Sequence, residues 1–406
     1  MLPLHTRATI TGTPGRPILK VIELTEFLRC RYKPSECALW YDGSDVLQRS
    51  RALTDMDWGA IVSPNAISPP LSCARCTVAA PAVPNVIAPG DVIRITERNH
   101  LVSILFRRKA RTNSLLVTER CNSFCVMCSQ PPVEHDDSYR VSELLDVIQL
   151  IDPELSVLGL TGGEPTLLGA NLVRLLSCLK LELARTRLHV LTNGRRFSDS
   201  EFAEQIAAVG HEQVVWAVPL YSDAPEIHDY VVQRRGAFDE TLQGLLNLAR
   251  LNQRIEIRMV LQKATVPRLP QLAHFIARNL TFVDHVAWMG LEPMGFARPN
   301  WTDLWLDPAD YVGKLKDAVH RLYEMRMATS IYNVPLCALP TELRPFARQS
   351  ISDWKNSYLP ECGGCSLRSD CCGFFSSAER KHLPRSVRPI PSTETSLSIT
   401  GGAARG

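Results

Sequence analysis

The chain has 406 residues, of which 45% are hydrophobic and 21% are charged, a composition typical of a globular protein with a buried core. Lys and Arg together number 45 and Asp and Glu number 42, so the net charge of +3 is too balanced to predict nucleic acid as a partner. No apolar run approaches the roughly 20 residues of a membrane span, and the start, MLPLHTRATI, lacks the apolar core of a secretory signal. We therefore expect a cytoplasmic protein with no membrane partner.

The chain contains 13 cysteines, and their spacing is uneven. In a reducing compartment cysteines are not expected to pair as disulfides, so close spacings are interpreted first as metal ligation. Cys73-x2-Cys76 has no obvious partner pair in the sequence, which leaves open a metal or redox role and no role at all. Cys30, Cys37 and Cys178 are expected to be ordinary buried side chains.

Residues 1–110 are predicted to form a small β-rich domain. Short apolar runs such as RPILKVIEL and GDVIRI are broken by Pro and Gly, and the stretch from Ser63 to Pro89 carries six prolines. The candidate edge strands of such a sheet could accept a peptide by strand addition.

Residues 111–305 alternate strand-like apolar runs with amphipathic helical segments, which predicts an α/β fold with parallel strands. Strands are predicted at residues 114–120, 156–162, 187–194, 214–221, 254–262 and 285–292, with helices at 142–151, 171–183, 199–210, 238–251 and 269–280. Six strands joined by right-handed crossovers indicate a partial (β/α)6 TIM-like barrel rather than eight closed strands. Functional residues are then expected where the strands end.

The C-terminal part is predicted to be an extension of the barrel. Residues 306–380 contain a predicted helix at 307–326 and a Cys-rich segment. Residues 381–406 are rich in Ser, Thr, Pro and Gly with few large apolar side chains, so a disordered tail is predicted there.

The sequence TERCNSFCVMCSQPP places Cys121, Cys125 and Cys128 at a Cys-x3-Cys-x2-Cys spacing directly after the first predicted barrel strand. Three thiolates with no fourth Cys or His nearby suit an iron–sulfur cluster with one open iron better than a closed tetrahedral zinc site. Zinc, or three ordinary buried cysteines, is the alternative.

This loop resembles that of the radical S-adenosylmethionine (SAM) superfamily, in which the same spacing follows strand 1 of a partial barrel. The resemblance implies that a 4Fe-4S cluster binds SAM at its open iron and reduces it, giving a 5′-deoxyadenosyl radical that abstracts hydrogen from a substrate. The family usually has an aromatic residue before the third cysteine, whereas this chain has Met127, whose thioether can also pack on a ring.

Loops at the ends of later strands are candidates for binding SAM. Gly162, Gly163, Glu164 and Pro165 match the family's GGEP motif, and the glycines allow close approach while the carboxylate can accept from the SAM amino group. Small polar groups follow strands 3 and 4, where they could bind ribose hydroxyls or the SAM carboxylate, or simply form turns: Thr192, Asn193 and Ser222. Arg258 could pair with the SAM carboxylate or form a salt bridge within the barrel.

A second set of cysteines offers four thiolates, which is enough for a closed cluster: Cys337, Cys362, Cys365 and Cys371. The Cys-x2-Cys-x5-Cys core resembles the auxiliary-cluster extensions of peptide-modifying radical SAM enzymes, which implies a second 4Fe-4S cluster. Structural zinc is the alternative, because four thiolates suit either metal. Cys372 replaces the usual glycine and, next to Cys371 in an extended segment, is expected to point away from the cluster.

Longer stretches over residues 110 to 380, among them LTGGEPTLLG, VPLYSDAPEIHDYVVQ and SISDWKNSYLPEC, resemble the HxsC-type radical SAM maturase of the His-Xaa-Ser system. This resemblance implies modification of a ribosomally made precursor peptide carrying His-Xaa-Ser repeats. It also implies a companion radical SAM maturase and an external electron donor as partners. Neither the resemblance nor the spacing identifies the bond that is made.

Two other functions are compatible with the sequence. One is a radical SAM cyclase or rearrangement enzyme that acts on a small molecule and also uses a second cluster. The other is a non-catalytic iron–sulfur or zinc scaffold that presents a partner peptide. Reductive SAM cleavage separates both enzyme functions from the scaffold, and turnover that depends on the peptide separates the two enzymes.

Overall fold

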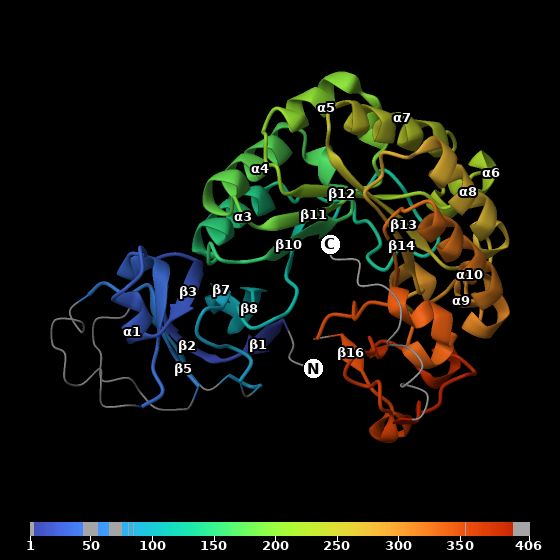
Figure 1. The fold of residues 1–406 in the computed structure, drawn as a ribbon. Coiled ribbons are helices and arrows are strands. Elements are labelled where there is room, and N and C mark those ends of the chain that lie inside the picture. Colours follow the sequence, from blue (N-terminus) through green and yellow to red (C-terminus); the bar gives the residue numbers. More distant parts are fainter. Residues whose placement is uncertain are drawn as a thin grey trace. The chain divides into compact units, whose positions relative to one another are not determined.

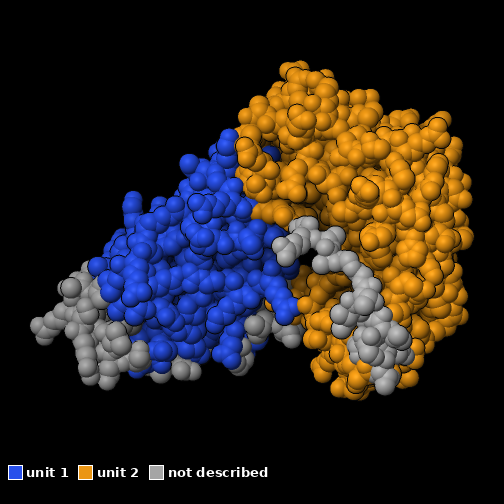
Figure 2. All heavy atoms as spheres, viewed as in Figure 1, with its two compact units in different colours: residues 1–117, 138–159, 174–186 blue, residues 118–137, 160–173, 187–406 orange. Residues whose placement is uncertain are grey.

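The computed structural model describes residues 4–43, 56–64, 75–79, 81–83, 85–353 and 355–392. The chain divides into two compact units, coloured separately in Figure 2: unit 1 is Met1–Val117, Ser138–Gly159 and Arg174–Thr186, and unit 2 is Thr118–Asp137, Leu160–Val173 and Arg187–Gly406. The domain limits after residues 110, 305 and 380 remain predictions. Cys73 and residues 393–406 of the predicted tail lie outside the described residues.

A seven-stranded sheet forms the predicted α/β part. Its strand order is β15 (Thr329–Tyr332), β14 (His285–Met289), β13 (Arg254–Val260), β12 (Val214–Pro219), β11 (Arg187–Leu191), β10 (Val157–Gly162) and β9 (Ser114–Thr118). The pairs from β11 to β15 are all parallel. All six predicted strands are confirmed, but the predicted number of six is wrong because β15, only four residues long, lies in the segment that was assigned to the extension.

Helices alternate with these strands (Figure 1). They are α3 (Tyr139–Leu150), α4 (Ala170–Glu182), α5 (Ser200–Ala207), α6 (Pro225–Val232), α7 (Ala237–Arg250), α8 (Leu269–Asn279), α9 (Trp301–Leu304) and α10 (Pro308–Glu324). Asp199 caps α5 by accepting from the N–H groups of Glu201 and Phe202, and Asp307 caps α10 by accepting from Ala309. The predicted helices are therefore confirmed, and α6 and the short α9 are additional.

Strand β13 shows how the sheet separates its two faces. Ile255, Ile257 and Met259 are fully buried, and α7 packs on this strand. Glu256 and Arg258 alternate with them and so lie on the opposite face. That second face carries polar side chains.

The N-terminal sheet has the strand order β1 (His5–Arg7), β8 (Leu101–Phe106), β7 (Val92–Thr96), β3 (Ile18–Ile22), β4 (Cys37–Trp40), β5 (Ala60–Ser63), β6 (Cys76–Ala79) and β2 (Thr9–Gly12). The strands β3, β4, β5 and β6 are parallel, and the short helix α1 (Leu24–Phe27) follows β3. The predicted β-rich character of this region is confirmed.

Strands β1 and β2 stand at opposite ends of this order, yet only Ala8 separates them in the chain. The Ala8 N–H donates to the His100 carbonyl (3.1 Å), and the Ala82 N–H donates to the Arg7 carbonyl (2.7 Å). Residues 5–12 thus bridge the two ends of the sheet and close it into a barrel. The predicted edge strands for peptide addition are therefore wrong for the described residues, because closure pairs the backbone groups that an edge would expose.

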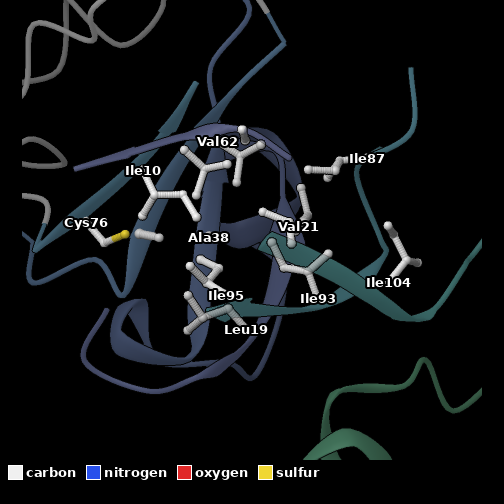
Figure 3. Packing of buried hydrophobic residues seen from close by; sticks show 14 of the residues in the cluster. Ile10, Leu19, Val21, Ala38, Val62, Cys76, Ile87, Ile93, Ile95 and Ile104 are labelled. Atoms are coloured by element: carbon white, nitrogen blue, oxygen red, sulfur yellow. The ribbon is translucent and has the colours of Figure 1, made fainter. Parts of the chain in front are cut away.

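The interior of this barrel is apolar (Figure 3). Leu19, Val21 and Ile93 are fully buried there, and Cys76 is 1% exposed among them. Burial raises the pKa of Cys76 to about 11, so its thiol behaves as a core side chain. Cys37 is also fully buried, whereas Cys30 and Cys178 are only half-buried, contrary to expectation.

The C-terminal residues contain little regular structure. Strands β16 (Asn356–Ser357) and β17 (Phe374–Phe375) form a short antiparallel pair. Short 3-10 turns make up much of the remainder. No helix among the described residues has the length and apolar composition needed to cross a membrane.

The Lys20 side chain in unit 1 is fully buried. The Lys20 ammonium donates to Asp152 (2.5 Å) and to the Leu150 carbonyl (2.9 Å), and its side chain is 0% exposed. Burial lowers the pKa of Lys20 although Asp152 favours the charged form. This pair therefore connects the N-terminal sheet to the end of α3.

Replacing Asp152 with Ala should destabilise the protein by about 2 to 4 kcal/mol, because it leaves the Lys20 charge buried without its partner. Lys20→Met in the same background should recover much of the loss, since no unpaired charge remains. Asp57→Ala, which breaks the exposed Arg75 pair, serves as the control and should change stability little. Urea unfolding measures all three, and equal effects of Asp152→Ala and Asp57→Ala would contradict the assignment.

Candidate metal centres

The cysteine loop begins directly after β9 and is held by hydrogen bonds on several sides. The Val126 N–H donates to the Val231 carbonyl at the end of α6 (2.9 Å), and the Asn300 amide donates to the Val126 carbonyl (2.9 Å). Arg195, which is nearly buried, donates to the Asn122 carbonyl (2.8 Å). These contacts define the conformation of a loop that contains no helix or strand.

The three thiols of this loop lie near one another and are half-buried. Burial raises the pKa of Cys121 to about 11 and that of Cys125 to about 12, and it also raises the pKa of Cys128. The neighbouring thiols and Glu164 raise the pKa values of Cys121 and Cys125 further. The thiols are therefore protonated at neutral pH unless a metal centre displaces their protons.

The donor set of this loop fits a cluster better than a single metal ion. Within the described parts of the chain, one group of three possible ligands has all its ligand atoms within 4.8 Å of one another: Glu119, His135 and Asp137. The sulfur atoms of the three loop cysteines lie farther apart than that. One tetrahedral zinc with Zn–S bonds of about 2.3 Å would require sulfurs about 3.8 Å apart. A cluster of several irons accepts a wider set of thiolates.

The paired glycines of the next loop pack against the start of the cysteine loop. A Cβ on Gly162 would lie 2.2 Å from the Thr118 carbonyl oxygen, and one on Gly163 would lie 2.1 Å from that of Arg120. The Gly163 N–H donates to the Thr118 carbonyl (2.8 Å). Only glycine permits this approach, so the motif brings the carboxyl ends of β9 and β10 together.

Glu164 is fully buried, and protein donors occupy both of its oxygens. Oε1 accepts from the Thr166 N–H (2.9 Å), the Thr166 hydroxyl (2.7 Å) and the Thr192 hydroxyl (2.6 Å), while Oε2 accepts from the Asn193 N–H (2.6 Å). The carboxylate thus links two loops of the chain, and because Oε2 has a single protein donor, the hydrogen bond from the SAM amino group stays a prediction.

Asn193 continues this link to the cysteine loop. Its side-chain amide donates to the Asn122 side-chain oxygen (2.6 Å), and its own side-chain oxygen accepts from the Arg195 N–H (3.1 Å). The Thr192 hydroxyl also accepts from the Gly194 N–H (3.1 Å). Hydrogen bonds therefore join the cysteine loop, the turn after β10 and the turn after β11.

The other residues predicted to bind the cofactor are buried in the loops that follow the strands. Met127 is 6% exposed within the cysteine loop, and Pro165 is buried at the start of the turn that follows Glu164. Ser222 is fully buried, and its hydroxyl accepts from the Ala224 N–H (3.1 Å) just before α6. Of the two alternatives for Ser222, its contacts match the turn-forming one.

Tyr221, a residue that was not predicted for the site, lies beside the three thiols of the cysteine loop. Burial raises its pKa well above the ordinary value, and the charges of Cys125 and Cys128 act in the same direction. Its hydroxyl therefore stays protonated next to the candidate cluster. Its position two residues after β12 was the only signal in the sequence.

The second set of cysteines also comes together in unit 2. Cys337 lies in the turn Leu336–Ala338, and its thiol interacts electrostatically with those of Cys371 and Cys362. The Cys365 N–H donates to the Cys362 carbonyl (3.2 Å), so these two residues share one turn. Cys337 thus meets three cysteines that follow it by 25 residues or more in the sequence.

Backbone N–H groups point at two of these sulfurs. Leu336 and Gly373 each donate to Cys371 Sγ at 3.4 Å, and Ile390 donates to Cys365 Sγ at 3.4 Å. Such donors stabilise negative charge on sulfur, as a thiolate ligand requires.

Cys371 and Cys372 differ strongly in their surroundings. A hydrogen bond from the Cys372 thiol, together with the backbone donors, lowers the pKa of Cys371 to about 6. Cys372 is 2% exposed, packs with Ile351 and Phe375, and has a pKa raised well above the ordinary value by that hydrogen bond and by burial. Residues 371–373 do not form a strand, and the Cys372 thiol donates to the Gly373 carbonyl (3.3 Å), so the opposite orientation of the two side chains stays a prediction.

The group of Glu119, His135 and Asp137 has a structural explanation. Asp137 is fully buried and accepts from the Thr118 hydroxyl (2.9 Å) and from the Glu119 N–H (2.6 Å). The Arg120 guanidinium lies 3.4 Å from the same carboxylate. Asp137 therefore ties the far end of the cysteine loop to β9.

Comparison with known proteins identifies this part of the chain. Residues 115–276 match the family model described as the radical SAM superfamily, and this match spans about two fifths of the chain. A comparison with curated proteins found no match.

Several solved structures are similar to part of the chain. One is Streptococcus suis SuiB bound to S-adenosylmethionine, with a TM-score of 0.42 and 13% identity over 56% of this chain and 48% of that one. Another is anSMEcpe with bound AdoMet and the Cp18Cys peptide, with a TM-score of 0.42 and 17% identity over 54% of this chain and 63% of that one. The coproporphyrinogen III oxidase HemN of Escherichia coli, a radical SAM enzyme, is also similar, with a TM-score of 0.41 and 17% identity over 53% of this chain and 52% of that one. The chain thus spans about half to two thirds of these structures.

Gly163→Ala should displace the cysteine loop, because the added Cβ meets the Arg120 carbonyl and lies 3.1 Å from Cys121 Cβ. We expect reconstituted protein to lose most of the iron bound by this loop. Gly313→Ala is the control, since an added Cβ there, on the exposed face of α10, meets nothing within 4 Å. Iron content and absorbance after anaerobic reconstitution measure the effect, and full iron in Gly163→Ala would refute the packing argument.

Proposed function

We propose that this chain is a radical SAM enzyme that modifies a ribosomally synthesised peptide carrying His-Xaa-Ser repeats. The observation that carries the proposal is the packing of the Gly162–Gly163 turn against the loop of Cys121, Cys125 and Cys128. This packing holds three thiols and a glycine turn at adjacent strand ends, where barrels of this kind collect their ligands.

In this proposal the loop thiols hold a 4Fe-4S cluster, and SAM binds beside it. The cluster and SAM together supply the 5′-deoxyadenosyl radical that abstracts hydrogen. The protein's own part is to hold the three thiols near one another beside the glycine turn. The proposed contacts for SAM at this turn are Glu164, whose Oε2 has a single protein donor, the glycine backbone and Met127, with Asn193 and Thr192 next to them.

Cys337, Cys362, Cys365 and Cys371 are the proposed ligands of a second 4Fe-4S cluster. Support comes from the N–H donors that face Cys365 and Cys371 and from the lowered pKa of Cys371. A closed cluster of this kind can pass electrons but cannot bind SAM. We propose that it takes part in electron transfer with an external donor.

The peptide substrate and the companion maturase rest on the sequence resemblance. The closed N-terminal barrel offers no free edge among its described strands, so the peptide has no place there by strand addition. The carboxyl ends of strands β9 to β15 are the proposed place of the peptide, because the cysteine loop and the glycine turn lie there.

Protein reconstituted anaerobically should cleave SAM to 5′-deoxyadenosine in the presence of a strong reductant. Replacing Cys121, Cys125 and Cys128 with Ala should abolish this, because no open iron remains. The matched control is Cys178→Ala, since Cys178 is half-buried in α4 and should not bind iron. Chromatography of the nucleoside product is the measurement, and cleavage by the triple variant would disprove the proposal.

The unmodified protein should bind about eight irons, four in each cluster, and Cys371→Ala should bind about four. Cys372→Ala should keep full iron, because Cys372 belongs to the hydrophobic cluster with Ile351 and Phe375. Iron and zinc analysis of the three proteins is the test. About four irons with stoichiometric zinc in the unmodified protein would show a structural zinc site instead.

A further inference from the structure

The polar face of the seven-stranded sheet carries a chain of hydrogen bonds that the proposed chemistry does not yet use. Its members are Glu256 on β13, His285 on β14, and Ser330 and Tyr332 on β15. The intervening residues Val286 and Ile331 are fully buried on the other face, beneath the helices.

Two hydrogen bonds connect the first three of these side chains, and Tyr332 stands next to the third. His285 Nδ1 lies 2.9 Å from Glu256 Oε2, and His285 Nε2 lies 3.0 Å from Ser330 Oγ. Tyr332 lies two residues beyond Ser330 on the same face of β15, and its ring centroid is 6.1 Å from that of His285. Three neighbouring strands thus contribute consecutive links.

The path has a direction along the sheet. Glu256 and His285 are paired near the beginning of β13 and β14. Tyr332 is the last residue of β15 and is paired with Met289, the last residue of β14. The path therefore runs from the carboxyl ends of the strands, where the cysteine loop lies, toward their beginnings. Five residues beyond Tyr332 the chain reaches Cys337.

Charge states fix the orientation of the hydrogen bonds. Burial favours neutral Glu256, but the hydrogen bond from His285 and the charge of Arg258 outweigh it and lower the pKa of Glu256. An ionised carboxylate only accepts, so His285 Nδ1 donates to it and Nε2 accepts from Ser330. Ser330 is then free to accept from Tyr332, whose pKa burial raises and which therefore keeps its proton.

We infer that Tyr332, Ser330 and His285 form a proton relay that ends at Glu256 and serves a substrate group with an O–H or N–H bond. This inference rests on the proposed function. A substrate carbon radical that bonds to such a heteroatom loses one proton and one electron. The electron passes to the oxidised second iron–sulfur cluster. Tyr332 takes the proton as it gives its own to Ser330, Ser330 gives its own to His285 Nε2, and Glu256 stabilises the resulting imidazolium.

Other charged groups face this path without belonging to it. Arg258 lies 3.4 Å from Glu256, and Arg348 acts on Tyr332. His189 on β11 and Arg187 beside it lie on the same side, and burial lowers the pKa of His189, which keeps it neutral. His189 is therefore a matched control: it carries an imidazole near Glu256 but no hydrogen bond of the chain.

The test compares product with cofactor consumption in the reconstituted full chain and a His-Xaa-Ser peptide. Tyr332→Phe and Ser330→Ala should release 5′-deoxyadenosine within about twofold of the unmodified rate but form at least about tenfold less modified peptide per nucleoside. The unmodified enzyme should form product more slowly in D2O, and both variants should lose this solvent effect. His189→Gln should keep the ratio and the solvent effect, and Ser330→Thr, which retains the hydroxyl, should recover both.

A second measurement does not depend on activity. In protein with 15N-labelled histidine, before cluster loading, His285 should show Nδ1 protonated and Nε2 bare, and Glu256→Gln should alter this signal. Equal product ratios in Tyr332→Phe and the unmodified enzyme, or a proton on Nε2, would overturn the relay. Nucleoside release by the unmodified enzyme without any peptide product would instead overturn the proposed function, and the imidazole spectrum would then decide the relay alone.

Discussion

The buried carboxylate of Glu164 is the contact on which the site depends. With four protein donors it joins the turn after β10 to the turn after β11, and Asn193 extends the link to Asn122 in the cysteine loop. A buried carboxylate is tolerated only when its oxygens are satisfied, so these loops cannot separate without exposing it unpaired. The cysteine loop and the two turns are thereby held in one arrangement.

This arrangement accounts for the chemistry proposed for the chain. Glycines bring the second loop against the first, and burial keeps the thiols protonated until iron binds. On the polar face of the same sheet, Glu256 and His285 orient a path for protons, and β15 leads from it to Cys337. In this proposal one sheet carries the cysteines that bind the clusters and the side chains that transfer protons.

The sequence predicted the strands well because their apolar runs are long and the helices between them are strongly amphipathic. It missed β15, since TSIY is too short to produce a periodic signal, and it missed the closure of the N-terminal barrel, which depends on residues 5–12 pairing with strands far along the chain. Motif spacing located the cysteines and glycines. The partners of Glu164 and the position of Tyr221 could not be predicted, because they follow from how separate loops meet in space.

The central claim is that Cys121, Cys125 and Cys128 hold a cluster whose open iron binds SAM. The most direct measurement is electron paramagnetic resonance of the reduced protein with electron–nuclear double resonance, using SAM labelled with 15N in its amino group and 17O in its carboxylate. Removing the second site by Cys362→Ala leaves one cluster to observe. The account predicts an altered spectrum on addition of SAM and hyperfine coupling to both labels, whereas an unchanged spectrum without coupling would contradict it.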